Sequence, residues 1–104
     1  MSLLITGSSG FIGTNLIKLL IKKKINFIGI DKKYNKYLSF KNFYKINLNN
    51  KSKLDHIIDK NKIKYIIHLA AIPGFVSCNN FPSNAFENNV DATFNLMLLA
   101  KKYK

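Results

Sequence analysis

The sequence predicts a single α/β domain, residues 1–104, with a parallel sheet of strand order 3-2-1-4 and helices on both faces. Three observations predict this class. Short apolar runs alternate with amphipathic helical patterns, the first apolar run ends in a glycine-rich turn, and the second ends in an aspartate. Because strands and helices alternate, neighbouring strands should be parallel and joined by right-handed crossovers.

The chain is organised around residues 3–13. Residues 3–6 predict a buried strand, and glycines follow at positions 7, 10 and 13, where a helical pattern begins. Gly7 can adopt backbone angles closed to other residues, Gly10 leaves the backbone open to a phosphate, and Gly13 allows close helix packing. The N–H groups and the dipole of the first helical turn would face the anion. This strand–turn–helix context favours a dinucleotide pyrophosphate site over a chance glycine cluster.

The first helix is predicted from residue 10 or 11 to Lys23. Its apolar positions are Ile12, Leu16, Ile17, Leu19, Leu20 and Ile21. The lysine run at 22–24 occupies the last turn, where cations complement the helix dipole, so we interpret it as a helix end and not as a binding patch.

The second strand is predicted over residues 26–31, and its last residue is Asp31. A carboxylate at this position can accept both hydroxyl hydrogens of the adenosine ribose, and it repels a 2′-phosphate. Asp31 therefore favours NAD over NADP, although Lys32 and Lys33 follow directly and soften that discrimination. The alternative is an aspartate that simply begins a surface turn.

The middle of the chain predicts a loop or short irregular helix over residues 33–41 and a short third strand over residues 43–47. Ser52 and Asp55 resemble a capping box. They would open a helix that ends near Asn61 and turns its apolar residues inward, namely Leu54, Ile57 and Ile58.

A fourth strand is predicted over residues 64–69, running into Ala70 and Ala71. Residues 72–82 predict a loop. The last helix is predicted from residue 83 or 84 to about Tyr103, and its buried face is expected to hold Val90, Phe94, Met97 and Leu98.

The net charge of +12 raises the possibility of nucleic-acid binding, but all 17 basic residues are lysines spread along the chain. Arginine is the residue whose fork reads phosphates and bases, so a basic polyanion-binding domain is only an alternative here. The longest apolar runs are too short to span a membrane. Met1 and Ser2 lead directly into the first strand, so we expect no signal peptide. Cys78 stands alone, which favours the cytoplasm.

Four stretches, in order and at matching spacings, resemble the NAD-dependent epimerase/dehydratase family. This family comprises extended short-chain dehydrogenase/reductases that act on nucleotide sugars. The stretches are residues 4–13, 29–31, 67–71 and 88–96. The resemblance implies a Rossmann-type three-layer fold and covers only the N-terminal part of a family member. Later strands and the substrate domain would be absent, and the fourth strand would be an open edge.

The resemblance implies a set of NAD-binding positions: Gly7, Gly10, Phe11, Ile12, Gly13, Asp31, Asn47, Leu48, Leu69, Ala70, Ala71 and Asn89. The backbone N–H groups of Phe11 and Ile12 would serve the pyrophosphate. Asn47 stands where the family usually has an aspartate, and its amide can accept from the adenine amino group without charge. Small side chains at 69–71 would let the cofactor approach closely, and Asn89 would order its loop.

The resemblance also bears on the segment from Gly74 to Pro82. Val76 stands where related epimerases have an arginine, and Cys78 stands where they have a serine, so those substrate contacts do not carry over. We expect Cys78 to be an inert loop or packing thiol. His68 is expected to be a structural histidine and His56 to lie on a helix surface, and no metal site is predicted.

In the family, a Ser or Thr and a Tyr-x-x-x-Lys beyond these stretches carry the proton transfers. Here the Tyr37–Lys41 pair lies too early for this role, so no catalytic residue is predicted. The sequence predicts the NAD-binding portion of an oxidoreductase resembling nucleotide-sugar epimerases and dehydratases. A non-catalytic NAD-binding or interaction module is the alternative. The small core and open edge make low independent stability the expectation.

Overall fold

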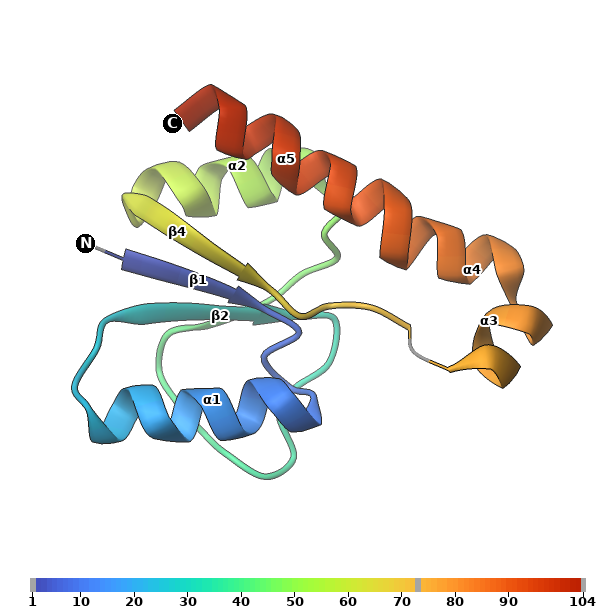
Figure 1. The fold of residues 1–104 in the computed structure, drawn as a ribbon. Helices are drawn as coiled ribbons and strands as arrows, with labels where there is room; N and C mark the ends of the chain where they lie inside the picture. Colours follow the sequence, from blue (N-terminus) through green and yellow to red (C-terminus); the bar gives the residue numbers. More distant parts are fainter. Residues whose placement is uncertain (1, 73, 104) are drawn as a thin grey trace.

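The computed structural model describes residues 2–72 and 74–103 and has three layers (Figure 1). Its strands are β1 (Ser2–Thr6), β2 (Phe27–Asp31), β3 (Phe43–Lys45) and β4 (Ile63–His68). Its α-helices are α1 (Phe11–Lys22), α2 (Lys51–Lys60), α3 (Phe75–Asn80), α4 (Pro82–Phe86) and α5 (Ala92–Tyr103), and a π-helical turn, η1 (Glu87–Asp91), joins the last two. Within the described ranges, no helix has the length and apolar character needed to cross a membrane.

The strands form one parallel sheet in the order β3-β2-β1-β4, which confirms the predicted order. The register of β2, β1 and β4 can be followed at Leu4 on β1, which pairs with Ile28 on β2 and with Ile66 on β4. Because the strands are parallel, the segments after β1, β2 and β4 all leave from the same edge of the sheet. β4 has β1 as its sheet neighbour on one side and is an outer strand of the described sheet, as expected.

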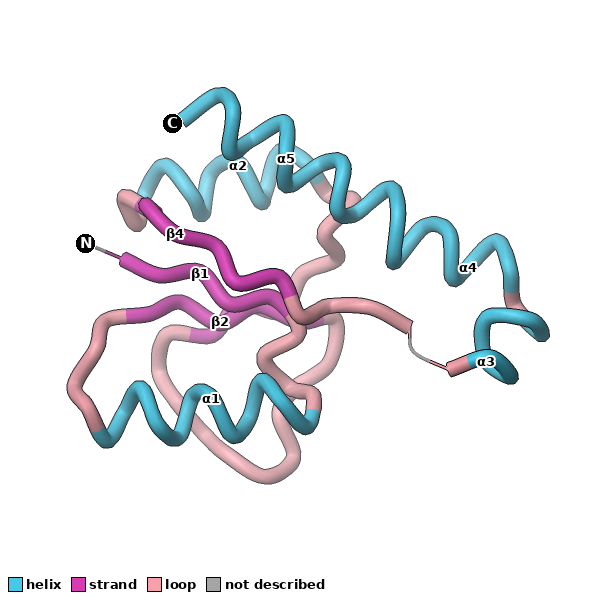
Figure 2. The backbone as a smooth tube through the Cα atoms, in the orientation of Figure 1, coloured by secondary structure: helices cyan, strands magenta, loops and turns pink. Residues whose placement is uncertain are grey.

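Helices cover both faces of the sheet, as Figure 2 shows: α1 lies on one side, and α2 and α5 lie on the other. The core on the α1 side is formed by Ile5, Ile17, Leu20 and Phe27. The larger core on the other side joins the sheet to α2 and α5. The segment between β2 and β3 is irregular and packs Leu38 and Phe40 against the α1 core.

Helix α1 begins at Phe11 as predicted, but part of its apolar pattern is exposed. The buried positions are Gly13, Thr14, Ile17 and Leu20. Ile12, Leu19 and Ile21 lie at the surface, so the expected face is too wide. The sheet contacts a single narrow stripe, and the helical period alone does not say which of several apolar stripes this is.

The start of α2 corrects the predicted capping box. The N-cap is Asn50, whose side chain accepts the backbone N–H of Lys53 at 3.3 Å, and the helix begins at Lys51. Ser52 lies inside the first turn and its hydroxyl donates to Asn50 Oδ1 at 3.3 Å. Asparagine caps helices as well as serine does, so a polar run of this kind leaves the choice to the local turn.

Two corrections concern the C-terminal third. The predicted loop over residues 72–82 contains α3 (Phe75–Asn80), while Pro73 lies outside the described residues. The expected buried face of the last helix is wrong: Val90, Phe94, Met97 and Leu98 are 44–65% exposed. The buried face consists instead of Ala92, Asn95, Leu96 and Leu99. Both the expected and the observed stripe have helical spacing, and packing against the core shared with the sheet and α2 selects Ala92, Leu96 and Leu99.

Candidate dinucleotide-binding site

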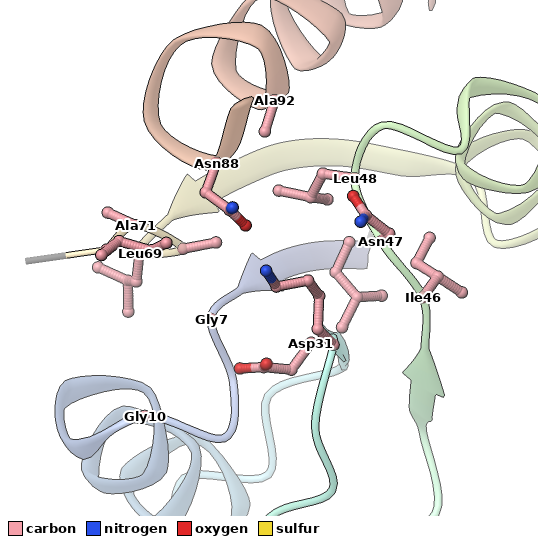
Figure 3. Close-up of a pocket in the computed structure, with 14 residues that line it drawn as sticks. Gly7, Gly10, Asp31, Ile46, Asn47, Leu48, Leu69, Ala71, Asn88 and Ala92 are labelled. Atoms are coloured by element: carbon pink, nitrogen blue, oxygen red, sulfur yellow. The ribbon is translucent and has the colours of Figure 1, made fainter. Parts of the chain in front are cut away.

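A groove with an empty volume of about 620 Å³ lies at the carboxyl edge of the sheet (Figure 3). The segments that follow β1, β2, β3 and β4 meet there, and η1 contributes Asn88. The lining residues are Gly7, Gly10, Ile30, Asp31, Lys32, Ile46, Asn47, Leu48, Leu69, Ala70, Ala71, Ile72, Asn88 and Ala92. In open parallel α/β sheets this edge is where ligands bind.

A side chain would meet different surroundings at each of the three glycines in the loop after β1. Gly7 has φ +70°, and an added Cβ would lie 2.7 Å from the backbone nitrogen of Ala70. A Cβ on Gly13 would lie 2.3 Å from the carbonyl oxygen of Gly7, so α1 packs directly against the loop. A Cβ on Gly10 would meet only that same oxygen, at 3.4 Å. Gly10 therefore faces open space at the groove, which is where a phosphate could approach.

The start of α1 offers backbone donors to that space. Gly10 is the N-cap, no side chain caps the helix, and no acidic residue lies in its first turn. The first N–H groups of a helix have no intrahelical acceptor, so those of Phe11 and Ile12 suit an anion. The side chains of Phe11 and Ile12 are 85% and 65% exposed and do not line the groove.

Asp31 is held by two backbone donors at the end of β2. Its Oδ2 accepts the N–H of Ser9 at 3.0 Å, and its Oδ1 accepts the N–H of Lys33 at 3.1 Å. Figure 3 shows the carboxylate pointing toward the glycine loop. A carboxylate oxygen has a second lone pair, so each oxygen of Asp31 can accept one more hydrogen bond. This geometry suits two adjacent hydroxyl groups.

Asn35 fastens the glycine loop from the outside. Its Nδ2 donates to Ser8 O at 3.1 Å and to Thr14 Oγ1 at 2.8 Å. Its Oδ1 accepts the N–H groups of Tyr37 and Leu38, at 2.8 and 3.0 Å. Sequence reasoning did not single out Asn35. Its bonds to Tyr37 and Leu38 are local, and an asparagine in a polar loop could have indicated that turn. Its bonds to Ser8 and Thr14 span 27 and 21 positions and leave no local signal.

The wall formed by Asn47 and Leu48 depends on α5. Asn47 Oδ1 accepts the N–H of Asn49 at 2.9 Å, so part of its accepting capacity closes a local turn. The buried Asn95 donates through Nδ2 to Asn49 Oδ1 at 2.8 Å, and Asn49 in turn donates to the carbonyl oxygen of Glu87 at 3.1 Å. The buried Asn95 on α5 therefore holds the segment after Leu48, next to the groove, in place.

Residues 69–72 form the opposite wall, next to β4. Thr6 Oγ1 accepts the N–H groups of Leu69 and Ala70 at 3.0 and 3.1 Å. The side-chain amide of Asn89 bonds both backbone groups of Ile72. Its Oδ1 accepts the N–H of Ile72 at 2.6 Å, and its Nδ2 donates to the carbonyl oxygen of Ile72 at 3.0 Å. Asn89 does not line the groove and instead orders this wall.

The structure brings eight of the twelve predicted positions to the groove lining and leaves Phe11, Ile12, Gly13 and Asn89 next to it. The lining residues that sequence reasoning did not assign are Ile30, Lys32, Ile46, Ile72, Asn88 and Ala92. All of them except Ala92 adjoin an assigned position in the sequence. Ala92 is brought to the groove by the π-helical turn that precedes it, which has no signal in the sequence.

The remaining candidates lie apart from the groove. Cys78 lies on α3 and donates through Sγ to the carbonyl oxygen of Ile72 at 3.2 Å, which suits a packing thiol. His56 is exposed on α2, as expected. Tyr37 is 78% exposed and is not a groove residue. Across residues 2–72 and 74–103, no group of three metal-binding side chains comes together.

Comparison with known proteins agrees with this geometry. Residues 3–104 match the model of the NAD dependent epimerase/dehydratase family. A dTDP-D-glucose 4,6-dehydratase of Dictyostelium discoideum is 37% identical over 115 residues, which cover 98% of this chain and 26% of that protein. A UDP-glucose 4-epimerase of Cyamopsis tetragonoloba is 30% identical over 117 residues, which cover 98% of this chain and 33% of that protein.

A solved structure of UDP-glucose 4-epimerase with UDP-glucose, from Thermotoga maritima, superimposes with a TM-score of 0.89 at 25% identity. The match covers 99% of this chain and 35% of that one. The fold and groove define a dinucleotide-binding Rossmann-type domain, and the chain belongs to the NAD-dependent epimerase/dehydratase family. It spans 26–35% of the length of these relatives.

Proposed function

We propose that this chain is the NAD-binding portion of an enzyme that epimerises or dehydrates a nucleotide sugar. The observation that carries the proposal is the position of Asp31. Its carboxylate is clamped by backbone donors and lines the same groove as the open face of Gly10. A ribose acceptor and a phosphate approach on one groove are what a dinucleotide requires.

The residues fit NAD in three places. The pyrophosphate would lie against Gly10 and the first N–H groups of α1, where no side chain competes. The adenosine ribose would donate both hydroxyl hydrogens to Asp31, whose charge disfavours NADP. The adenine would lie beside Asn47 and Leu48, and the middle of the cofactor would pass along residues 69–71.

NAD, when bound, supplies a hydride acceptor for the oxidation of a sugar hydroxyl. In this proposal the chain's own residues bind and orient the cofactor, and none of them carries proton transfer. The nucleotide sugar and the catalytic side chains would meet the cofactor through residues outside this chain. A cytoplasmic location is part of the proposal, since the single cysteine calls for no oxidising compartment.

Thermal unfolding of the purified chain, with and without NAD, tests the proposal. We expect a cooperative transition that NAD raises in the wild type and raises much less in Asp31→Ala. A transition that NAD leaves unchanged would contradict it. Cooperative unfolding with selective NAD binding, and turnover that stays absent when the rest of an enzyme is supplied, would instead support the non-catalytic module. Salt-sensitive nucleic-acid binding indifferent to NAD would favour the polyanion-binding alternative.

A further inference from the structure

His68 lies at the end of β4, between the side chains of Thr6 on β1 and Thr93 on α5. Its Nδ1 is 2.6 Å from Thr6 Oγ1, and its Nε2 is 2.8 Å from Thr93 Oγ1. The ring is half-buried, and both nitrogens have partners, which confirms the expectation of a structural histidine. The same bonds link the groove wall to the last helix.

The surrounding bonds select one protonation state of His68. The hydroxyl of Thr93 donates its single hydrogen to the carbonyl oxygen of Asn89 at 2.8 Å. Towards the imidazole it can therefore only accept, so the hydrogen of that bond is on Nε2. Thr6 Oγ1 already accepts the N–H of Ala70 and shares the N–H of Leu69 with the carbonyl oxygen of Thr6. Its own hydrogen is the donor that remains for Nδ1, which is 2.6 Å away. The ring is neutral, with its hydrogen on Nε2.

His68 stands between two clamps on residues 69–72. Thr6 holds the first two residues of this segment through their N–H groups, and Asn89 holds Ile72 at the other end. The ring reaches Thr6 directly and reaches Asn89 through the Thr93 hydroxyl. A displacement of η1 at Asn89 would therefore be transmitted through Thr93 and His68 to the end of β4.

We propose that His68 is a positioning residue whose neutral ring couples the two clamps and keeps residues 69–72 in place along the cofactor groove. The hydrogen bonds of His68 to Thr6 and Thr93, and of Thr93 to Asn89, make this coupling. Its effect on cofactor affinity rests on the proposed function, because it requires that the groove hold NAD.

The coupling predicts a pH dependence. A protonated ring would carry a hydrogen on Nδ1 and aim a third donor at Thr6 Oγ1, in competition with the N–H groups of Leu69 and Ala70. Burial, and not a neighbouring charge, lowers the pKa of His68 below its usual 6.5, and its contacts from β1 and α5 are the uncharged Thr6 and Thr93. The unfolded chain then binds the proton more readily than the folded chain, so the coupling is complete above pH 6.5 and fails as the pH falls through the folded pKa.

Nitrogen chemical shifts of the two imidazoles test the protonation state in the unmodified chain. We expect His68 at pH 7.5 to show a protonated Nε2 and an unprotonated Nδ1, and to titrate below the usual imidazole pKa of 6.5. A hydrogen on Nδ1, or a charged ring at that pH, would overturn the proposal. This measurement needs no variant.

Amide hydrogen exchange in Thr93→Val and Thr93→Ser tests the coupling. Valine keeps the side-chain shape but removes the hydroxyl, whereas serine keeps the hydroxyl. We expect the valine variant to speed exchange about 2- to 10-fold at Leu69 and Ala70, on the far side of the ring, as well as at Ile72. Serine should stay within about two-fold of the wild type. An effect confined to Ile72 would show a local role and overturn the coupling.

NAD titration separates this inference from the proposed function. We expect Thr93→Val to weaken NAD binding about 2- to 10-fold. Wild-type affinity should fall as the pH drops through the folded pKa of His68, which lies below 6.5, and should fall more steeply than in His68→Asn. His56→Asn is the matched control and should follow the wild type. If the wild type binds no NAD, the proposed function fails, and the exchange data still decide the coupling. NAD binding with equal affinities and parallel pH profiles in all variants would overturn the positioning role.

Discussion

The backbone N–H of Ser9 donates to Oδ2 of Asp31 over 3.0 Å and so joins the glycine loop after β1 to the end of β2. The hydroxyl of Ser9 donates to the carbonyl oxygen of Lys33 at 2.6 Å, and the N–H of Lys33 returns to Asp31 Oδ1 at 3.1 Å. These three bonds close a ring. The carboxylate is therefore oriented by the chain itself, which lowers the cost of ordering it when a ribose binds.

Replacing Asp31 by Asn should weaken NAD binding about 10- to 100-fold, since it removes the charge and leaves one of the two backbone donors without its acceptor. NADP affinity should fall less, because the repulsion of the 2′-phosphate also disappears. Titration of both cofactors against the variant measures the ratio. Asp91→Asn, at an exposed position on η1, is the control. An unchanged NAD to NADP ratio would count against the ribose role of Asp31.

Alanine at Gly13 should lower stability, whereas alanine at Gly10 should lower NAD affinity. At Gly13 the new Cβ would lie 2.3 Å from a backbone oxygen, and we expect about 2–3 kcal/mol of destabilisation in urea unfolding. At Gly10 the contact is 3.4 Å, so stability should change by less than about 0.5 kcal/mol. The Gly10 variant should instead lose NAD affinity, because the methyl group occupies the phosphate approach. Equal loss of stability in both variants would refute this division of roles.

Asn35→Asp tests the fastening of the glycine loop. The substitution replaces the Nδ2 donor with an acceptor that faces the carbonyl oxygen of Ser8. We expect a loss of about 1–3 kcal/mol in unfolding free energy, measured by urea denaturation. Asn26→Asp makes the same chemical change at an exposed position between α1 and β2 and should be nearly neutral. Similar midpoints for the two variants would show that the Asn35 amide does not fasten the loop.

Asp55 ties α2 to α5, because it accepts from Lys102 Nζ at 2.7 Å and from the hydroxyl of Tyr103. These donors, Lys102 first, hold the pKa of Asp55 below its usual 3.8. The tie therefore contributes fully above pH 3.8 and is lost as the pH falls through the folded pKa. We expect Asp55→Asn to lower Tm at pH 7 and to converge with the wild type in acid. Parallel pH curves would contradict the tie, and Asp59→Asn is the control.

Lys24 follows α1 with φ 56°, a left-handed conformation that glycine adopts without cost. Lys24→Gly should therefore stabilise the chain by about 0.5–1 kcal/mol, measured by thermal or urea unfolding. Lys23→Gly, one residue earlier at φ −86°, removes the same charge and should destabilise. A loss of stability in both variants would mean that the backbone angle of Lys24 carries no strain.

Local pattern was enough to predict the glycine loop, the parallel sheet order and Asp31 at the end of β2. These features depend on neighbours in the chain: an apolar run, glycines at a fixed spacing, and an acid at a strand end. Backbone sterics and strand chirality then leave few arrangements open. The sequence by itself therefore determined the fold class and the edge of the sheet where the groove lies.

Tertiary structure alone decided which apolar stripe of α1 and of α5 is buried. Each helix carries more apolar residues than one face can bury. In α5, packing places Asn95 inward, whereas Phe94 and Met97, which were expected there, are exposed. The bonds of Asn35 to Thr14, of Asn95 to Asn49 and of His68 to Thr6 join residues 21, 46 and 62 positions apart. Such pairings leave no periodic trace in a sequence, because they form only when the packed layers bring the partners within hydrogen-bond distance.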